Sequence, residues 1–203
     1  MPPMPRRFTL AAMLPFAIAT AHAATADEAS VEDKSDTYYV SLLGTTLNHR
    51  TIGTRDDTTW SAAGTLVVGS YLTDLFHAEF RAGTGLSEGN VSPDFTLNID
   101  YFASWYIGLQ YPLTPYSHVY GQFGFSYVQG TADLQNPGED RNDPYRAIND
   151  SYPDSSFSVS WVTGIDLEVI ENTYLVLEGG RLFKDTGSRA NTFQFSSGIR
   201  YEF

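Results

Sequence analysis

Charged side chains on the polar side of otherwise apolar segments are the residues of this chain best suited to chemistry. Several stand at such positions, Glu168 among them, and five of these form the candidate cluster: Glu79, Arg81, Asp166, Glu178 and Arg200. Since an ion away from water is stable only when it is paired, we expect the two arginines to pair with some of the three carboxylates. Such pairs are structural if they stay together, and they form a gate for ions if they exchange partners. The residue types allow both interpretations.

A histidine beside a serine and a carboxylate would point to hydrolytic chemistry. The histidines that follow the N-terminal leader are His49, His77 and His118. His77 and His118 adjoin predicted tight turns, and a hydrogen bond from His77 to a carboxylate such as Glu79 explains that residue without catalysis. The remaining candidates fall in two predicted polar loops and follow no recognised motif: His49, Ser87, Ser92 and Asp94. We therefore predict no catalytic residue and no enzymatic activity.

Carboxylates also gather in the longest irregular stretch, residues 132–155. They are Asp133, Glu139, Asp140, Asp143, Asp150 and Asp154. Their spacing fits no regular calcium loop, so solvated loop charge is the expected role. The chain has no cysteine, which excludes disulfides and thiolate metal sites. We predict no metal and no cofactor, and we regard Tyr145, Ile148 and Tyr152 as candidates for contact with a partner.

The elements that carry these residues alternate apolar and polar side chains with a period of two, which is typical of half-buried β-strands. Eight such segments are predicted, at residues 37–46, 59–72, 75–85, 95–111, 117–131, 156–169, 173–183 and 192–203. Tight turns alternate with longer loops, such as the one at 47–58. The pattern predicts an antiparallel meander with both of its ends on the side of the tight turns.

The apolar faces indicate how the strands are oriented. Segment 95–111 has an apolar residue at every odd position, and the other segments add large rings. The rings are Trp60, Phe80, Trp105, Phe123, Phe125, Trp161, Phe193 and Phe195. An eight-stranded interior is too narrow for so many rings, so we place them against lipid around a polar, wet lumen. The prediction is an all-β, eight-stranded antiparallel up-and-down transmembrane β-barrel.

Two observations qualify this orientation. A soluble periplasmic carrier of the lipocalin type shows the same alternation but holds its rings inside, and it remains the alternative from a different class. Arg181 falls on the apolar parity of its segment, which predicts either a bulge at Gly179 and Gly180 or an arginine at the wet rim.

The composition limits the partners. The formal net charge of −12 argues against nucleic acid, which requires a basic surface. The mean hydropathy is −0.23, and outside the leader no apolar run reaches the length of a membrane-spanning helix.

The N-terminal region has the features of an export signal. Arg6 and Arg7 precede a short apolar run, and Ala21-His22-Ala23 has the small-x-small pattern that signal peptidase recognises. We predict a cleavable Sec-type signal peptide at 1–23, a flexible acidic segment at 24–36 and the barrel at 37–203.

The last predicted strand, TFQFSSGIRYEF, is similar to the C-terminal assembly signal of Gram-negative outer-membrane β-barrels, with apolar Ile199, Tyr201 and Phe203 alternating with polar residues. Residues 64–71 and 78–82 resemble the small OmpA-like and OmpX-like barrels. The resemblance implies a location in the outer membrane, contact with the barrel-assembly machinery through this strand, and a monomer surrounded by lipid and lipopolysaccharide.

The function that the resemblance implies is structural, with display of surface loops for interaction. Three alternatives stay open: a small gated ion channel, of the kind that the inner charge clusters of OmpA-like barrels suggest; a barrel enzyme that modifies lipid A; and the soluble carrier described above.

Overall fold

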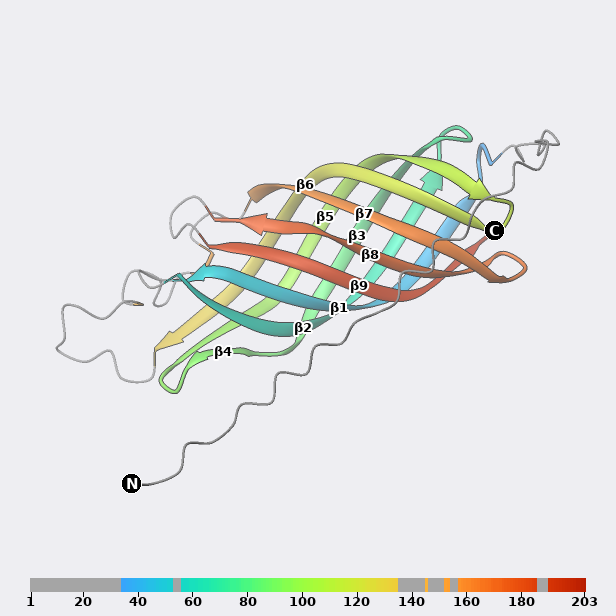
Figure 1. The fold of residues 1–203 in the computed structure, drawn as a ribbon. Coiled ribbons are helices and arrows are strands. Elements are labelled where there is room, and N and C mark those ends of the chain that lie inside the picture. The colour runs from blue at the N-terminus through green and yellow to red at the C-terminus, as the bar shows by residue number, and fades with distance from the viewer. Residues whose placement is uncertain (1–33, 53–55, 135–144, 146–151, 154–156, 186–189) are drawn as a thin grey trace, which may run out of the picture. The chain divides into compact units, whose positions relative to one another are not determined.

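The computed structural model describes residues 34–52, 56–134, 145, 152–153, 157–185 and 190–203. These residues form nine β-strands (Figure 1). The strands are β1 (Tyr38–Ile52), β2 (Asp57–Tyr71), β3 (Phe76–Ser87), β4 (Gly89–Ser92), β5 (Phe95–Thr114), β6 (Ser117–Leu134), β7 (Phe157–Ile170), β8 (Thr173–Lys184) and β9 (Asn191–Glu202). In the part of the chain that the structure describes, no helix is long and apolar enough to span a membrane.

Eight of the strands close into a barrel. Each pairs antiparallel with its neighbours in the chain, β3 pairs with β5, and β1 pairs with β9 to complete the wall. The short β4 pairs only with the start of β5 and extends the wall at one edge. The predicted all-β, eight-stranded up-and-down barrel is confirmed, and the pairing of β1 with β9 closes its wall. At the loop end β6 continues to Leu134, beyond the last residue that it pairs with β7.

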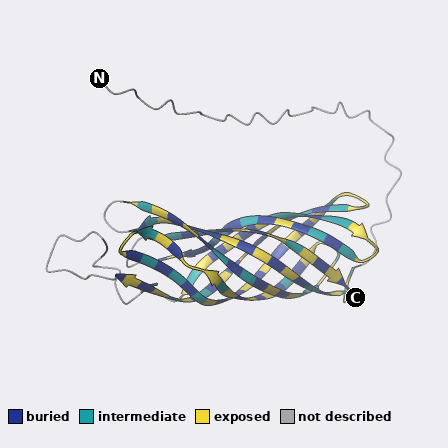
Figure 2. Cartoon of the chain, turned by 90° about the horizontal axis from the view of Figure 1, so that it is seen from below, coloured by how far each residue is buried: buried dark blue, intermediate teal, exposed yellow. Residues whose placement is uncertain are grey.

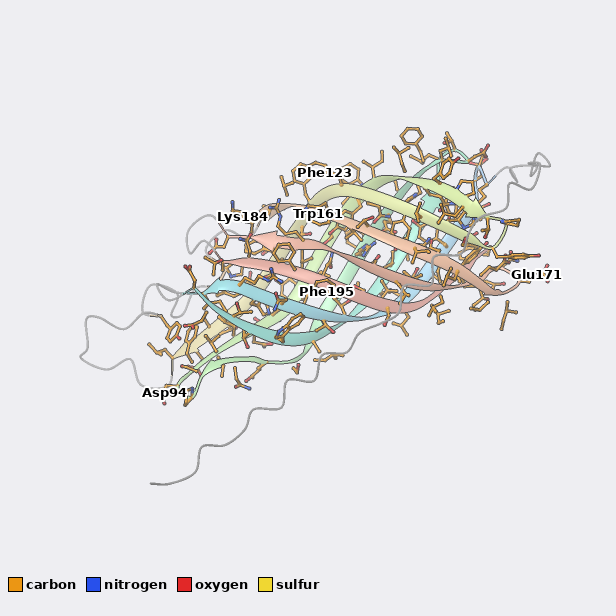
Figure 3. The ribbon with its side chains drawn as sticks, viewed as in Figure 1. Asp94, Phe123, Trp161, Glu171, Lys184 and Phe195 are labelled. Carbon is orange, nitrogen blue, oxygen red and sulfur yellow. The ribbon has the colours of Figure 1, made fainter. Side chains whose placement is uncertain are left out.

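The two ends of the barrel differ. Tight turns join β2 to β3, β5 to β6 and β7 to β8, and Glu171 lies at this end together with the C-terminus (Figures 1 and 3). We call it the turn end. The longer connections lie at the opposite end, which carries Asp94 and Lys184 and which we call the loop end (Figure 3).

The strands extend farther than the alternation predicts, mainly at the loop end. β1 runs to Ile52 rather than to residue 46, so the predicted loop at 47–58 begins six residues too early. These polar residues are strand because both neighbouring strands pair with them; His49, for example, lies opposite Thr59 and Thr192. The predicted loop at 86–94 contains β4, and β5 continues through Pro112, where its pairing with β6 shifts register.

Burial alternates residue by residue along the strands, as the bands in Figure 2 show. In β1 the side chains of Tyr39 and Ser41 are buried, whereas Leu42 is exposed. The three tryptophans lie on the outer face, with exposed fractions of 53% for Trp60, 52% for Trp105 and 38% for Trp161. The rings therefore face away from the lumen, which confirms the predicted orientation and contradicts the lipocalin-like alternative.

Segment 95–111 does not keep one orientation, and here the prediction is wrong. Ile99 lies opposite Gly130 but Tyr101 lies opposite Gln129, so Asp100 is an extra residue in β5. Such a bulge exchanges the two faces of a strand, because side chains alternate with a period of two. The odd residues before the bulge are consequently buried inside the barrel: Phe95, Leu97 and Ile99.

The interior has two zones. At the loop end it holds a large apolar cluster, which includes two residues from the long third connection. The members are Leu47, Ile52, Ala63, Phe95, Leu97, Ile99, Phe102, Val128, Ala132, Leu134, Tyr145, Tyr152, Leu182, Phe183 and Ala190. We call this set the apolar plug. The buried ionised groups lie toward the turn end. The prediction of a polar lumen is thus wrong for much of the loop end, mainly because the bulge in β5 turns large apolar side chains inward, although polar side chains such as His49 and Thr192 are buried there too.

Candidate functional site in the charged lumen

Arg81 is the centre of the charged zone. It projects inward from β3 and is 1% exposed. Its Nε donates to Glu79 at 2.6 Å, and its Nη2 donates to Glu178 at 3.0 Å and to Gln122 at 2.9 Å. A second guanidinium nitrogen binds the other oxygen of Glu178, so this pair is bidentate. The guanidinium also stacks over the ring of Tyr106, with 5.0 Å between Cζ and the ring centroid.

Arg200 forms a second buried pair nearer to the turn end. It projects inward from β9 and binds Asp166 of β7. Its Cζ lies 4.4 Å from the centroid of the Tyr39 ring and 5.5 Å from that of Tyr120. Its Nε donates to Ser41 at 3.4 Å. Two tyrosine rings therefore flank the guanidinium inside the lumen.

The same two tyrosines join the pairs into one network. The Tyr39 hydroxyl donates to Glu79 at 2.9 Å, and the Tyr120 hydroxyl donates to Glu178 at 2.8 Å. The sequence-predicted cluster is thus brought together by β3, β7, β8 and β9, with the tyrosines as links from β1 and β6. Alternation places both tyrosines on the inward parity of their strands, but the sequence analysis singled out the charged residues and not these links.

Lys34 closes the network at the turn end. Its Nζ donates to Glu202 at 2.9 Å and lies 5.1 Å and 5.0 Å from the ring centroids of Tyr71 and Tyr174. Its backbone nitrogen donates to Asp74. Lys34, which belongs to the predicted segment 24–36, is thus bound to the barrel. Residues 24–33 lie outside the described residues.

The network is close to electrically balanced. Three cations and four carboxylates belong to it: Lys34, Arg81, Arg200, Glu79, Asp166, Glu178 and Glu202. The formal sum is +3 − 4 = −1. Rings of like-charged side chains are one way in which channels select ions, and a nearly balanced set of buried ion pairs is not such a ring.

His77 contacts a different partner from the one expected. Its Nε2 lies 2.6 Å from the Nε2 of Gln122, not against Glu79. Since an amide NH₂ only donates, the imidazole nitrogen that faces it is the acceptor. Gln122 in turn accepts from Arg81, so His77 is connected to the charged network through Gln122 and not through a carboxylate.

His49 lies inside the barrel rather than in an outer loop. Its Nε2 is 2.8 Å from Ser61 Oγ, and its Nδ1 is 3.0 Å from Thr192 Oγ1. The Tyr152 hydroxyl, 3.1 Å from Thr192 Oγ1, covers the pair. Burial raises the pKa of this hydroxyl to about 12, so it remains protonated and able to donate. His49 and Ser61 are 0% and 4% exposed, so a lipid substrate has no access to them.

The other candidates do not meet His49. Ser87 accepts a hydrogen bond from the backbone of Ala62 at 3.0 Å, and Ser92 pairs with the start of β5 as part of β4. Asp94 lies in the connection beyond it, at the loop end (Figure 3). Among the described residues no group of three or more His, Cys, Asp or Glu side chains is arranged to hold a metal ion.

The sequence matches the profile of the outer membrane protein beta-barrel domain over residues 9–203. The chain belongs to this family. No curated protein matches it in sequence.

Solved structures of three outer-membrane barrels share the fold of this family member. Neisserial surface protein A (NspA) is 16% identical, with a TM-score of 0.55 over 82% of this chain and 97% of that one. OprG from Pseudomonas aeruginosa is 12% identical, with a TM-score of 0.55 and coverages of 85% and 98%. Ail, the attachment invasion locus protein of Yersinia pestis, solved with the heparin analogue sucrose octasulfate, is 8% identical, with a TM-score of 0.53 and coverages of 83% and 99%.

The residues that resemble the assembly signal of such barrels lie on the outer face of β9. Ile199, Tyr201 and Phe203 are all exposed. The backbones of Phe203 and Tyr38 exchange hydrogen bonds of 2.9 Å and 3.1 Å, so the last residue extends the pairing between β9 and β1. This pairing places the three rings on the outer wall, where β9 meets β1.

Proposed function

We propose that this family member is a non-enzymatic outer-membrane barrel that serves as a stable wall and displays its four connections at the cell surface. The observation that carries the proposal is the filled interior. The apolar plug occupies the loop end, and the Arg81 and Arg200 pairs cross the turn half. Because the lumen is occupied by the barrel's own side chains, the surfaces left to act on other molecules are the connections and the outer wall.

The plug argues most strongly against a channel. Tyr145 stacks on Phe95 with 4.6 Å between ring centroids and 6° between ring planes. Both rings are almost completely buried, as is Tyr152. An ion that crossed this zone would lose most of its hydration, because the cluster is apolar and its neighbouring polar groups, such as His49, Ser61 and Thr192, are already bonded to one another. Exchange of partners around Arg81 would therefore not be enough to open a passage.

The lumen also argues against lipid A chemistry. The one histidine and serine pair within hydrogen-bonding distance among the described residues, His49 and Ser61, points into the barrel, while a lipid lies against its outer face. We therefore propose a role without catalysis, in which the protein is exported by its signal peptide, assembled through β9 and present as a monomer in lipid and lipopolysaccharide.

The charge of the third connection limits the partners that the display would suit. Residues 132–155 contain six carboxylates and two arginines, a formal net charge of 2 − 6 = −4. An acidic segment repels polyanions and attracts cationic surfaces. The sulfated ligand of Ail is thus a poor guide for this chain, and we propose partners with a basic or neutral surface.

Recording in planar bilayers tests the proposal. The purified barrel should give no conductance steps beyond those of a bilayer without protein, and protease added to whole cells should cut the 132–155 connection while leaving the barrel intact. Regular conductance steps that the Glu178→Gln variant abolishes or enlarges would overturn the proposal in favour of the gated channel. A connection protected in intact cells but cut after lysis would overturn the display role.

A further inference from the structure

The cations of the described residues fall into two groups. Six lysines and arginines are described, and three of them lie in the lumen network. The other three are Arg50, Arg181 and Lys184, and all lie at the loop end of β1 and β8, the two strands on either side of β9. On the described part of the outer wall, positive charge is therefore confined to one place in a chain whose net charge is −12.

Strand register shows that the three residues share one face. Arg50 and Lys184 both lie opposite Asn191, so they occupy one row across three strands. Arg181 lies opposite Phe193, two residues nearer to the middle of the wall. With strands about 4.8 Å apart and about 3.4 Å per residue, the backbones of Arg50 and Lys184 are about 10 Å apart and the second row is about 7 Å below. We call this triangle the cationic triad.

A bulge in β8 creates the triad. The register between β8 and β9 shifts between Arg181 and Phe183. Leu182 and Phe183 are both buried in the apolar plug, so two consecutive side chains point inward. Lys184 consequently lies on the same outward face as Arg181, whereas strict alternation would turn it into the lumen. A bulge was predicted at Gly179 and Gly180, and the observed one lies slightly farther along β8, between Arg181 and Phe183. Arg181 stays on the outer face.

The triad has no anionic partner among the described residues. The ion pairs found there involve Lys34, Arg81 and Arg200 only. Arg50 donates to Asn48 and stacks over Phe193, 4.9 Å from the ring centroid, which holds its charge against the wall. The Nε of Arg181 is buried without a hydrogen-bond partner in this part of the structure. A buried guanidinium N–H without an acceptor is costly, which points to a ligand that supplies one.

The surroundings identify the chemistry of that ligand. Arg181 lies opposite Trp161 and Phe193, two rings of the membrane-facing wall. In Figure 3, Trp161 and Phe195 lie nearer to the middle of the barrel than Lys184. Aromatic residues with cations beyond them mark the level of lipid headgroups. A molecule held there needs an anion for the triad and apolar chains for the wall below it.

We propose that the cationic triad binds the phosphorylated headgroup of lipid A, the outer-leaflet glycolipid, with its acyl chains against the rings of β7, β8 and β9. The inference rests on the proposed outer-membrane location with the loop end outward. Guanidinium groups form charge-assisted hydrogen bonds with phosphate oxygens, and an array with three cations suits a headgroup that carries more than one phosphate. The site would fix lipopolysaccharide to one side of the barrel.

Binding of purified lipid A to the folded barrel in detergent micelles tests the site, with bisphosphorylated lipid A, lipid A treated to remove its phosphates and inorganic phosphate as probes. The test variant is Arg50→Gln/Arg181→Gln/Lys184→Gln. The control Lys34→Gln/Arg141→Gln/Arg146→Gln removes the same formal charge from the turn end and from the 132–155 connection. At roughly a fivefold loss per cation, the test variant should bind bisphosphorylated lipid A about a hundredfold more weakly, and the control should bind within about threefold of the original chain.

Several results would overturn the site: equal loss in both triple variants, binding unaffected by removal of the phosphates, or displacement of the lipid by millimolar inorganic phosphate. The heat-dependent gel shift shows whether the test variant is folded, and the three single variants replace it if it is not. Membrane fractionation separates the two proposals. A protein in the outer membrane that ignores lipid A refutes the triad alone, whereas a protein found elsewhere refutes the proposed function as well.

Discussion

Replacing Arg81 with methionine should destabilise the barrel more than any other single change in the lumen. The substitution keeps most of the apolar stem of the side chain but removes the guanidinium that pairs with Glu79 and Glu178, which are 2% and 8% exposed. Both carboxylates would then be buried without their cation. Breaking one buried pair costs about 3–5 kcal/mol, so we expect the free energy of unfolding to fall by about 4 kcal/mol or more.

The assay is urea unfolding in lipid vesicles, followed by tryptophan fluorescence and by the heat-dependent gel shift. A double-mutant cycle isolates the pair. Glu178→Gln in the Arg81→Met background should recover part of the loss, with a coupling energy of about 2 kcal/mol. The Lys34→Gln variant is the control, because its cation lies at the turn end and is less buried than Arg81.

A loss below about 1 kcal/mol for Arg81→Met, with no coupling to Glu178, would refute the reasoning. It would mean that water enters the lumen and solvates the carboxylates, as it does in exposed ion pairs. The turn half would then be a wet passage, and the argument against a channel would depend on the apolar plug alone.

Three further predictions concern the wall. Gly124→Ala should lower the free energy of unfolding by about 1–3 kcal/mol in the urea assay, because the added Cβ would lie 1.8 Å from the Trp105 carbonyl oxygen. The control Gly121→Ala, whose Cβ meets nothing within 4 Å, should change it by less than about 0.5 kcal/mol, and equal effects of the two variants would contradict the packing. Deleting Asp100 removes the bulge and would turn the buried side chains of Phe95, Leu97 and Ile99 to the opposite face of β5, so the barrel should unfold at a lower temperature in the heat-dependent gel shift. Asp100→Ala keeps the extra residue and the register, so it should have the smaller effect. Removing Phe203 should reduce the yield of folded barrel in cells but not its refolding from urea, and an equal yield would argue against β9 as an assembly signal.

The alternation in the sequence was enough to predict the barrel, because a period of two imposes one environment on each face of a strand. It failed where a strand gains a residue. Nothing in the composition of segment 95–111 marks Asp100 as the extra residue, since its odd positions are apolar on both sides of it. The position of the bulge is set by the pairing with the partner strand β6, and the periodicity of one segment contains no information about that pairing.

The candidate site was predicted in part. The charged residues were identified because ions on alternating segments have few stable environments, but their tyrosine links were not, and neither was His77 against Gln122. His49 was misplaced because its polar neighbours Asn48 and Arg50 look like a loop. Both of its neighbouring strands extend equally far, and that common length is a property of the assembled sheet rather than of any one segment.

The pairing of β1 with β9 makes the wall depend on residues that are farthest apart in the chain. Twelve positions from Tyr39 to Arg50 have their partners in the final strand, so this edge of β1 stays unpaired until synthesis of the chain is nearly finished. An export route must therefore protect the first strand from adhering to other extended segments in the meantime. Removing the last dozen residues would delete β9 and leave β1 and β8 as unpaired edge strands, not a closed barrel of seven strands.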